Sequence, residues 1–94
     1  MTFEELTQSL KQPEPPAMGD PLRALWLAKK GEWDGAHRIV SDLTSKTAAR
    51  IHAHLHRVEG DLSNAAYWYR QASVPVEKGP LDGEWETLVR ELLP

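Results

Sequence analysis

Apolar residues recur three and four positions apart along most of the chain, which is the spacing of one face of an α-helix. The clearest stripe consists of Ala48, Ile51, Leu55 and Val58, and a similar one continues from Leu62. No stretch alternates with the two-residue period of a strand. We therefore predict an all-α fold.

Start and stop signals divide the chain into segments. Thr2 and Glu5 have the spacing of a capping box, Asp20 before Pro21 is a typical helix start, and Asp82 is predicted to cap the last helix. Together these signals predict one domain with an N-terminal helix, a proline-rich connector, two helix pairs, an irregular segment and a C-terminal helix, over residues 1–12, 13–19, 20–73, 74–80 and 81–94.

Each central helix pair turns at a glycine followed by an acidic residue. Gly31-Glu32-Trp33 is followed by Ala36, Gly60-Asp61-Leu62 is followed by Ala65, and Gly83-Glu84-Trp85 echoes the pattern. The pattern resembles the tetratricopeptide repeat family, whose helix pairs turn at such a corner. The resemblance implies two degenerate tetratricopeptide-like hairpins with right-handed helical-repeat packing, capped by the short terminal helices.

A second resemblance covers the corner of the second helix pair. The chain is similar to short bacterial proteins that carry the run HLHRxEGDxxNAxYWYR, which matches this sequence from His54 to Arg70. The resemblance implies a small bacterial helical-repeat protein and points to no reaction.

Histidines are concentrated near the two corners. If a tight turn over residues 44–46 makes the flanking helices antiparallel, His37 lies beside Ala53, with His52 and His56 as its neighbours. The Gly60 corner then places Asn64 level with His56, and Trp68 level with His52. We therefore predict one groove rimmed by side chains from three helices: His37, His52, His56, Arg57, Asn64, Tyr67 and Trp68.

These histidines allow several interpretations. His52 and His56 are one helical turn apart and could bind a metal, with His37 as the third ligand. Histidines that form hydrogen bonds at the edge of a core have the same spacing. A general acid or base beside Glu59 is a third interpretation. No nucleophile elbow, phosphate loop or carboxylate pair accompanies them, which argues against an enzyme, and no cofactor is expected.

The aromatic and charged neighbours are also open to two interpretations. Tyr69 lies on the core stripe, whereas Tyr67 points away from it and Trp68 lies at its edge. Both rings could bind a partner, or they could pack on the last helix through Trp85. The nearby charges are predicted to form weak surface or corner ion pairs; they are Arg57, Glu59, Asp61 and Arg70.

Composition narrows the classes of function. The chain has 94 residues, a formal net charge of −3 and no cysteine. The acidic charge argues against a nucleic-acid partner, and the lack of cysteine excludes disulfides and zinc–thiolate sites. No segment has the features of a signal peptide or a bilayer span, so a cytoplasmic location without membrane contact is expected.

Two functions follow as expectations. The first is a protein- or peptide-interaction module that uses the predicted groove. The second is a small-ligand or metal-binding protein, with catalysis left open, that uses the same histidine and aromatic cluster. A homodimer is an alternative to a different partner, because a two-repeat array leaves apolar ends exposed unless the terminal helices cover them.

Overall fold

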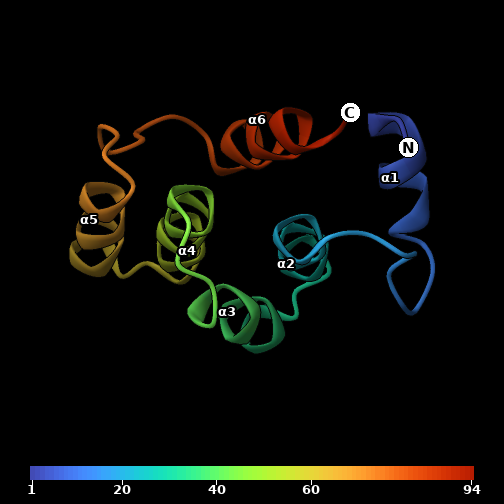
Figure 1. Cartoon of the computed structure of the whole chain (residues 1–94), viewed down its shortest axis with the longest axis horizontal. Helices are drawn as coiled ribbons and strands as arrows, with labels where there is room; N and C mark the ends of the chain where they lie inside the picture. Colours follow the sequence, from blue (N-terminus) through green and yellow to red (C-terminus); the bar gives the residue numbers. More distant parts are fainter.

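The computed structural model describes all 94 residues and consists of six α-helices without a strand, which confirms the all-α prediction. Helix α4 is central: α5 and α2 lie beside it, α3 covers one face and α6 crosses the opposite face (Figure 1). None of the helices is long and apolar enough to cross a bilayer. The helices are α1 (Phe3–Ser9), α2 (Asp20–Lys29), α3 (Trp33–Ser41), α4 (Lys46–Glu59), α5 (Leu62–Gln71) and α6 (Leu81–Leu92).

The corners follow the chemistry that the sequence predicts. The hydroxyl of Thr2 accepts from the backbone N–H of Glu5, whose side chain accepts in return from the N–H of Thr2. Gly60 ends α4 with a φ of 86°, in the left-handed region that favours glycine. The carboxylate of Asp61 then accepts from the N–H of Asn64 and caps α5. The α4–α5 corner is therefore fixed by local interactions.

The start of α6 differs from the prediction. Pro80 occupies the N-cap position with extended backbone, so α6 begins at Leu81 and Asp82 lies inside its first turn. Asp82 instead forms an ion pair with Lys29, with 2.9 Å between Oδ1 and Nζ. Gly83, Glu84 and Trp85 consequently lie within the helix. The third echo of the corner pattern is not a turn.

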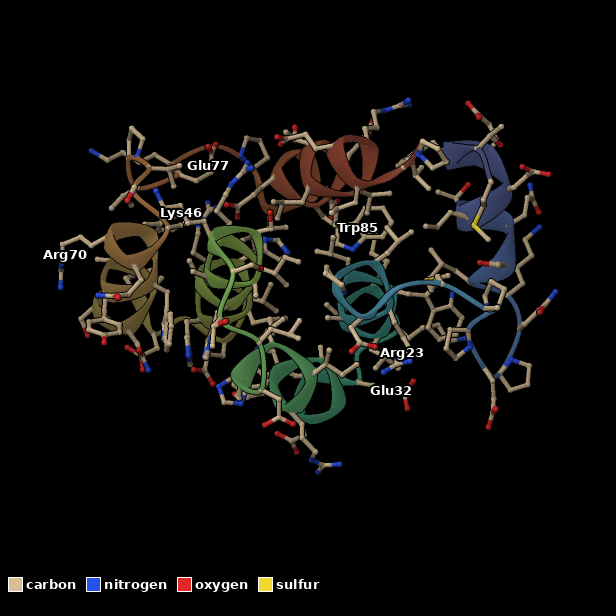
Figure 2. All side chains as sticks on the ribbon, in the orientation of Figure 1. Arg23, Glu32, Lys46, Arg70, Glu77 and Trp85 are labelled. Carbon is tan, nitrogen blue, oxygen red and sulfur yellow. The ribbon has the colours of Figure 1, made fainter.

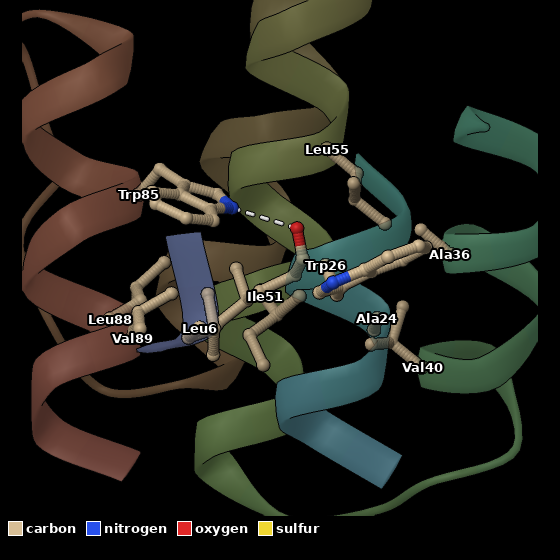
Figure 3. Packing of buried hydrophobic residues seen from close by; sticks show 11 residues of the cluster. Leu6, Ala24, Trp26, Ala36, Val40, Ile51, Leu55, Trp85, Leu88 and Val89 are labelled. Atoms are coloured by element: carbon tan, nitrogen blue, oxygen red, sulfur yellow. Dashed lines mark hydrogen bonds between the residues drawn. The ribbon is translucent and has the colours of Figure 1, made fainter. Parts of the chain in front are cut away.

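The main core joins five of the six helices (Figure 3). Trp26 is fully buried, and its Nε1–H donates to the hydroxyl of Ser9 over 3.0 Å, which fixes α1 against α2. Trp85 donates from Nε1 to the carbonyl of Leu25 over 2.7 Å and so fixes α6 to the same helix. Buried indoles need such partners. The cluster comprises Leu6, Ala24, Leu25, Trp26, Ala36, Val40, Ile51, Leu55, Trp85, Leu88 and Val89.

Two residues of the predicted stripes lie outside this core. Val58 is 45% exposed and Leu62 is 66% exposed. Both flank the α4–α5 corner, where the chain reverses at the end of the bundle and no neighbouring helix covers them. Helical spacing identifies the inward face of a helix but not the turn at which its neighbours end. Tyr69, on the same predicted stripe, is 2% exposed as expected.

A buried carboxylate connects three helices on the α6 side of α4. Glu84 in α6 accepts from Nδ1 of His54 and from Nη1 of Arg57, each over 2.7 Å, and from the hydroxyl of Tyr69. Arg57 also donates from Nη2 to the carbonyl of Gly79 over 2.5 Å. The prediction that Arg57 forms a surface ion pair or lines the groove is wrong. The physical reason is that α6 covers this face of α4 and buries the pair.

The charges in this Glu84 network are assigned by its surroundings. Burial raises the pKa of Glu84, but the hydrogen bonds from His54 and Tyr69 and the nearby positive charge outweigh it and leave the pKa below its ordinary value. Burial and the adjacent carboxylate raise the pKa of Tyr69. Glu84 is therefore ionised, Tyr69 stays protonated and donates, and Arg57 supplies the balancing charge.

We predict that Glu84→Ala lowers the free energy of unfolding by about 2 to 4 kcal/mol, because it leaves the partly buried guanidinium of Arg57 and the buried hydroxyl of Tyr69 without their partner. Urea unfolding followed by circular dichroism measures the change. Glu86→Ala is the matched control, since Glu86 lies in the same helix but pairs with Arg90 at the surface; its effect should stay within about 0.5 kcal/mol. Equal effects of the two substitutions would show that the network does not hold α6.

Candidate metal centre

Three imidazoles converge on the face of α4 that lies opposite the Glu84 network. His52 and His56 are one turn apart on α4, and His37 reaches them from α3. The Nε2 atoms of His37 and His52 are 3.0 Å apart. One ring nitrogen from each of the three residues lies within 4.8 Å of the other two. The antiparallel register of α3 and α4 thus brings together the histidines that the sequence placed side by side.

Two indole rings hold this histidine cluster in place. Trp33 stacks on His37, with 4.7 Å between ring centroids and 11° between ring planes, and its Nε1–H donates to the carbonyl of Leu55 over 2.6 Å. Trp68 from α5 stacks on His52 at 3.9 Å and 10°. The alternative that Trp68 packs on Trp85 is wrong, because Trp85 faces Phe3 and α2 instead.

A carboxylate orients the third histidine. Nδ1 of His56 lies 2.6 Å from Oε1 of Glu59, one turn further along α4. Nδ1–H is the donor in this pair, so the lone pair of the imidazole is on Nε2. Metal-binding histidines commonly have this arrangement, in which a carboxylate sets the tautomer and raises the basicity of the ligating nitrogen.

Two of the three histidines have a lowered pKa. Burial, together with the neighbouring imidazoles of His37 and His56, lowers the pKa of His52 to about 4. Burial and the His56 imidazole also lower the pKa of His37. Protonating one imidazole would place a positive charge beside two other rings, where little solvent is available to screen it. His37 and His52 therefore present neutral nitrogens at neutral pH, the form that metal ions require.

One of these nitrogens is both unpaired and accessible. The side chain of His56 is 6% exposed, and its only hydrogen bond is made by Nδ1. Every side-chain nitrogen or oxygen that is fully buried in this protein has a hydrogen-bond partner. Nε2 of His56 has none, so it must contact solvent. The cluster thus has an opening to solvent at the side of His56.

The other predicted groove residues lie elsewhere. Arg57 is in the Glu84 network on the opposite face. Tyr67 is 45% exposed and meets Trp68 edge-on, with ring centroids 5.1 Å apart. The backbone N–H of Asn64 joins the α5 cap, and its side chain forms no hydrogen bond to a histidine. His37, His52, His56 and Trp68 are the predicted residues that the structure brings together.

Sequence reasoning missed the supporting roles of Trp33 and Glu59. Trp33 enters the sequence pattern as part of the Gly31 corner, although it precedes His37 by one helical turn, a spacing that allows their rings to stack. Glu59 follows His56 by three residues, which is the spacing that allows their contact. A second possible ligand group joins His56 and Glu59 to Asp61. In that group, the carboxylate of Glu59 already contacts His56, and the carboxylate of Asp61 caps α5.

No protein-family model, curated protein or solved structure matches this chain. The resemblances to tetratricopeptide repeats and to the bacterial run therefore stay predictions. Function has to be inferred from the side chains themselves, and the histidine cluster is the group whose chemistry is most specific.

We predict that the metal-free protein loses stability as the pH falls from 6.5 toward 4. In that range the unfolded chain protonates His52, whereas the folded protein does not, so protons favour the unfolded state. Wild-type protein should lose up to about 3 kcal/mol more than His52→Gln, which cannot titrate. Urea unfolding of both proteins at several pH values, with a chelator present, measures the difference. Parallel pH profiles would contradict the prediction.

Proposed function

We propose that this protein binds a transition-metal ion, zinc being the best match, through the Nε2 atoms of His37, His52 and His56. The observation that carries the proposal is the 3.0 Å separation between Nε2 of His37 and Nε2 of His52. Two nitrogens bound to tetrahedral zinc at 2.0–2.1 Å are about 3.3 Å apart. The ion would therefore fit if these two nitrogens moved slightly apart and the ring of His56 moved toward them.

The set of ligands favours a particular group of metals. Neutral imidazoles suit zinc, copper, nickel and iron, whereas calcium and magnesium prefer oxygen ligands. The three ligands carry no formal charge, and the chain has no cysteine to supply thiolate. Glu59 behind His56 places one negative charge next to the set and partly balances a divalent cation.

Metal binding would rearrange one hydrogen bond within the cluster. Without an ion, the 3.0 Å contact between His37 and His52 requires one Nε2 to carry the proton and the other to accept it. An ion needs the lone pairs of both nitrogens, so the donor ring must move its proton to Nδ1. Because His37 and His52 are already neutral at neutral pH, this move of the proton within the pair releases none to solvent.

We predict that zinc binds the wild-type protein at one site and raises its melting temperature by several degrees. At a free zinc concentration 100 times the Kd, the stabilisation is about 2.7 kcal/mol. His37→Gln, His52→Gln and His56→Gln should each weaken binding by at least about tenfold. Isothermal titration calorimetry measures the affinity. Quenching of Trp33 and Trp68 fluorescence by copper(II) or nickel(II) gives an independent readout, since both indoles stack on cluster rings.

The matched control for zinc binding is His54→Gln. His54 is the one histidine outside the cluster, lies on the same helix and contacts Glu84 instead. This variant should bind zinc like the wild type, even if it unfolds at a lower temperature. Equal affinities for all four variants, or no binding by the wild type, would refute the proposed site.

We propose an interaction module as the second candidate function, as the two-repeat resemblance implies. It is supported by the exposed Tyr67, which is 45% accessible beside Trp68 and has the guanidinium of Arg70 6.0 Å from its ring centroid. Exposed aromatic and arginine side chains are common at protein interfaces. A protein or peptide that binds here would contact the outer edge of the cluster, with a second copy of the chain as one variant.

We predict that a partner recovered with wild-type protein in a pull-down is lost with Tyr67→Ala and with Trp68→Ala. Val76→Ala is the control, since Val76 is 44% exposed but lies in the connector before α6. Sedimentation of the purified protein tests the homodimer in the same preparations. Recovery of the same partner with all variants would exclude this surface.

A further inference from the structure

We infer that the ion keeps an open coordination position, which takes water or a small monodentate anion. This inference rests on the proposed metal function and specifies its kind. A structural zinc site is closed by four protein ligands, whereas a site with three protein ligands binds an exchangeable fourth group. The histidine cluster belongs to the second kind, because only three side chains converge on it.

Three nearby groups that could supply a fourth ligand are already engaged elsewhere. Glu59 is held by Nδ1 of His56, on the side of that ring away from Nε2. Asp61 accepts from the backbone of Asn64 and from the hydroxyl of Ser63 at the start of α5. His54 lies on the other face of α4, where Glu84 engages it. Each of these groups already has a structural role that ligation would disrupt.

The open position faces solvent. Nε2 of His56 is unpaired and in contact with solvent, as shown by the absence of any fully buried side-chain nitrogen or oxygen without a partner. His37 is only partly buried at the same edge, between α3 and α4. The indole of Trp68 stacks on His52, and that of Trp33 stacks on His37 and meets His56 edge-on. A small ligand would enter from this partly exposed edge.

The chemistry of the bound group follows from the three neutral ligands. Because these ligands carry no charge, they do not neutralise the divalent ion. Its positive charge therefore favours an anion at the fourth position. Water bound to zinc in such sites ionises near pH 7. The site would accordingly hold hydroxide at slightly alkaline pH and exchange it for azide, cyanate or a carboxylate.

Cobalt(II) substitution tests this inference, because its visible spectrum reports both the number and the identity of its ligands. Cobalt-loaded wild-type protein should show the intense absorption of four-coordinate cobalt. Azide should shift the spectrum with saturation at one equivalent, and a pH titration without azide should show one transition near neutrality. His54→Gln, loaded in the same way, should respond like the wild type.

The outcomes separate the two proposals. Failure of cobalt and zinc to bind at all overturns the metal function itself. Binding with a spectrum that neither azide nor pH changes leaves the metal function intact and overturns the open position. Dimerisation induced by one cobalt per two chains, detected by sedimentation, would show that a second copy supplies the remaining ligands and would also overturn it.

Discussion

The burial of α4 on all sides is the constraint on which the rest of the structure depends. Residues 51 to 56 of this helix are all buried in succession, although three of them are histidines. A helix in that position exposes little of its polar groups to solvent, so most of them find a partner in the protein. His54 finds Glu84 on one face, while His52 and His56 find His37 and Glu59 on the other.

The two faces of α4 meet this constraint in opposite ways. On the α6 side the carboxylate of Glu84 accepts from Arg57, His54 and Tyr69, and the charge of Arg57 balances it. On the α3 and α5 side the groups are mainly imidazoles, and Nε2 of His56 has no partner beside two other rings. The first arrangement serves packing. The second leaves a ligand atom available, which is why we assign function to that side.

The sequence could predict what depends on local geometry. Gly60 and Asp61 specify their corner by backbone freedom and capping, and the register of antiparallel helices then places His37 near His52. The sequence could not predict contacts that depend on how distant helices pack. Arg57 and Glu84 are 27 residues apart, and their pairing requires the position of α6. Helical spacing likewise does not show that Val58 is exposed because no neighbouring helix covers it.

The hydrogen bond from Trp85 to the Leu25 carbonyl joins residues 60 positions apart and fixes α6 to the first helix pair. Because α6 also packs on α4, it connects the first helix pair to the second. In a linear array of repeats each unit contacts only its neighbours, so the ends can fray while the middle stays folded. Here α6 touches α2 and α4 together, and Figure 2 places the labelled Trp85 side chain between α6 and α2. Release of α6 would expose the cores of both pairs at once. The chain should therefore unfold in a single cooperative step rather than repeat by repeat.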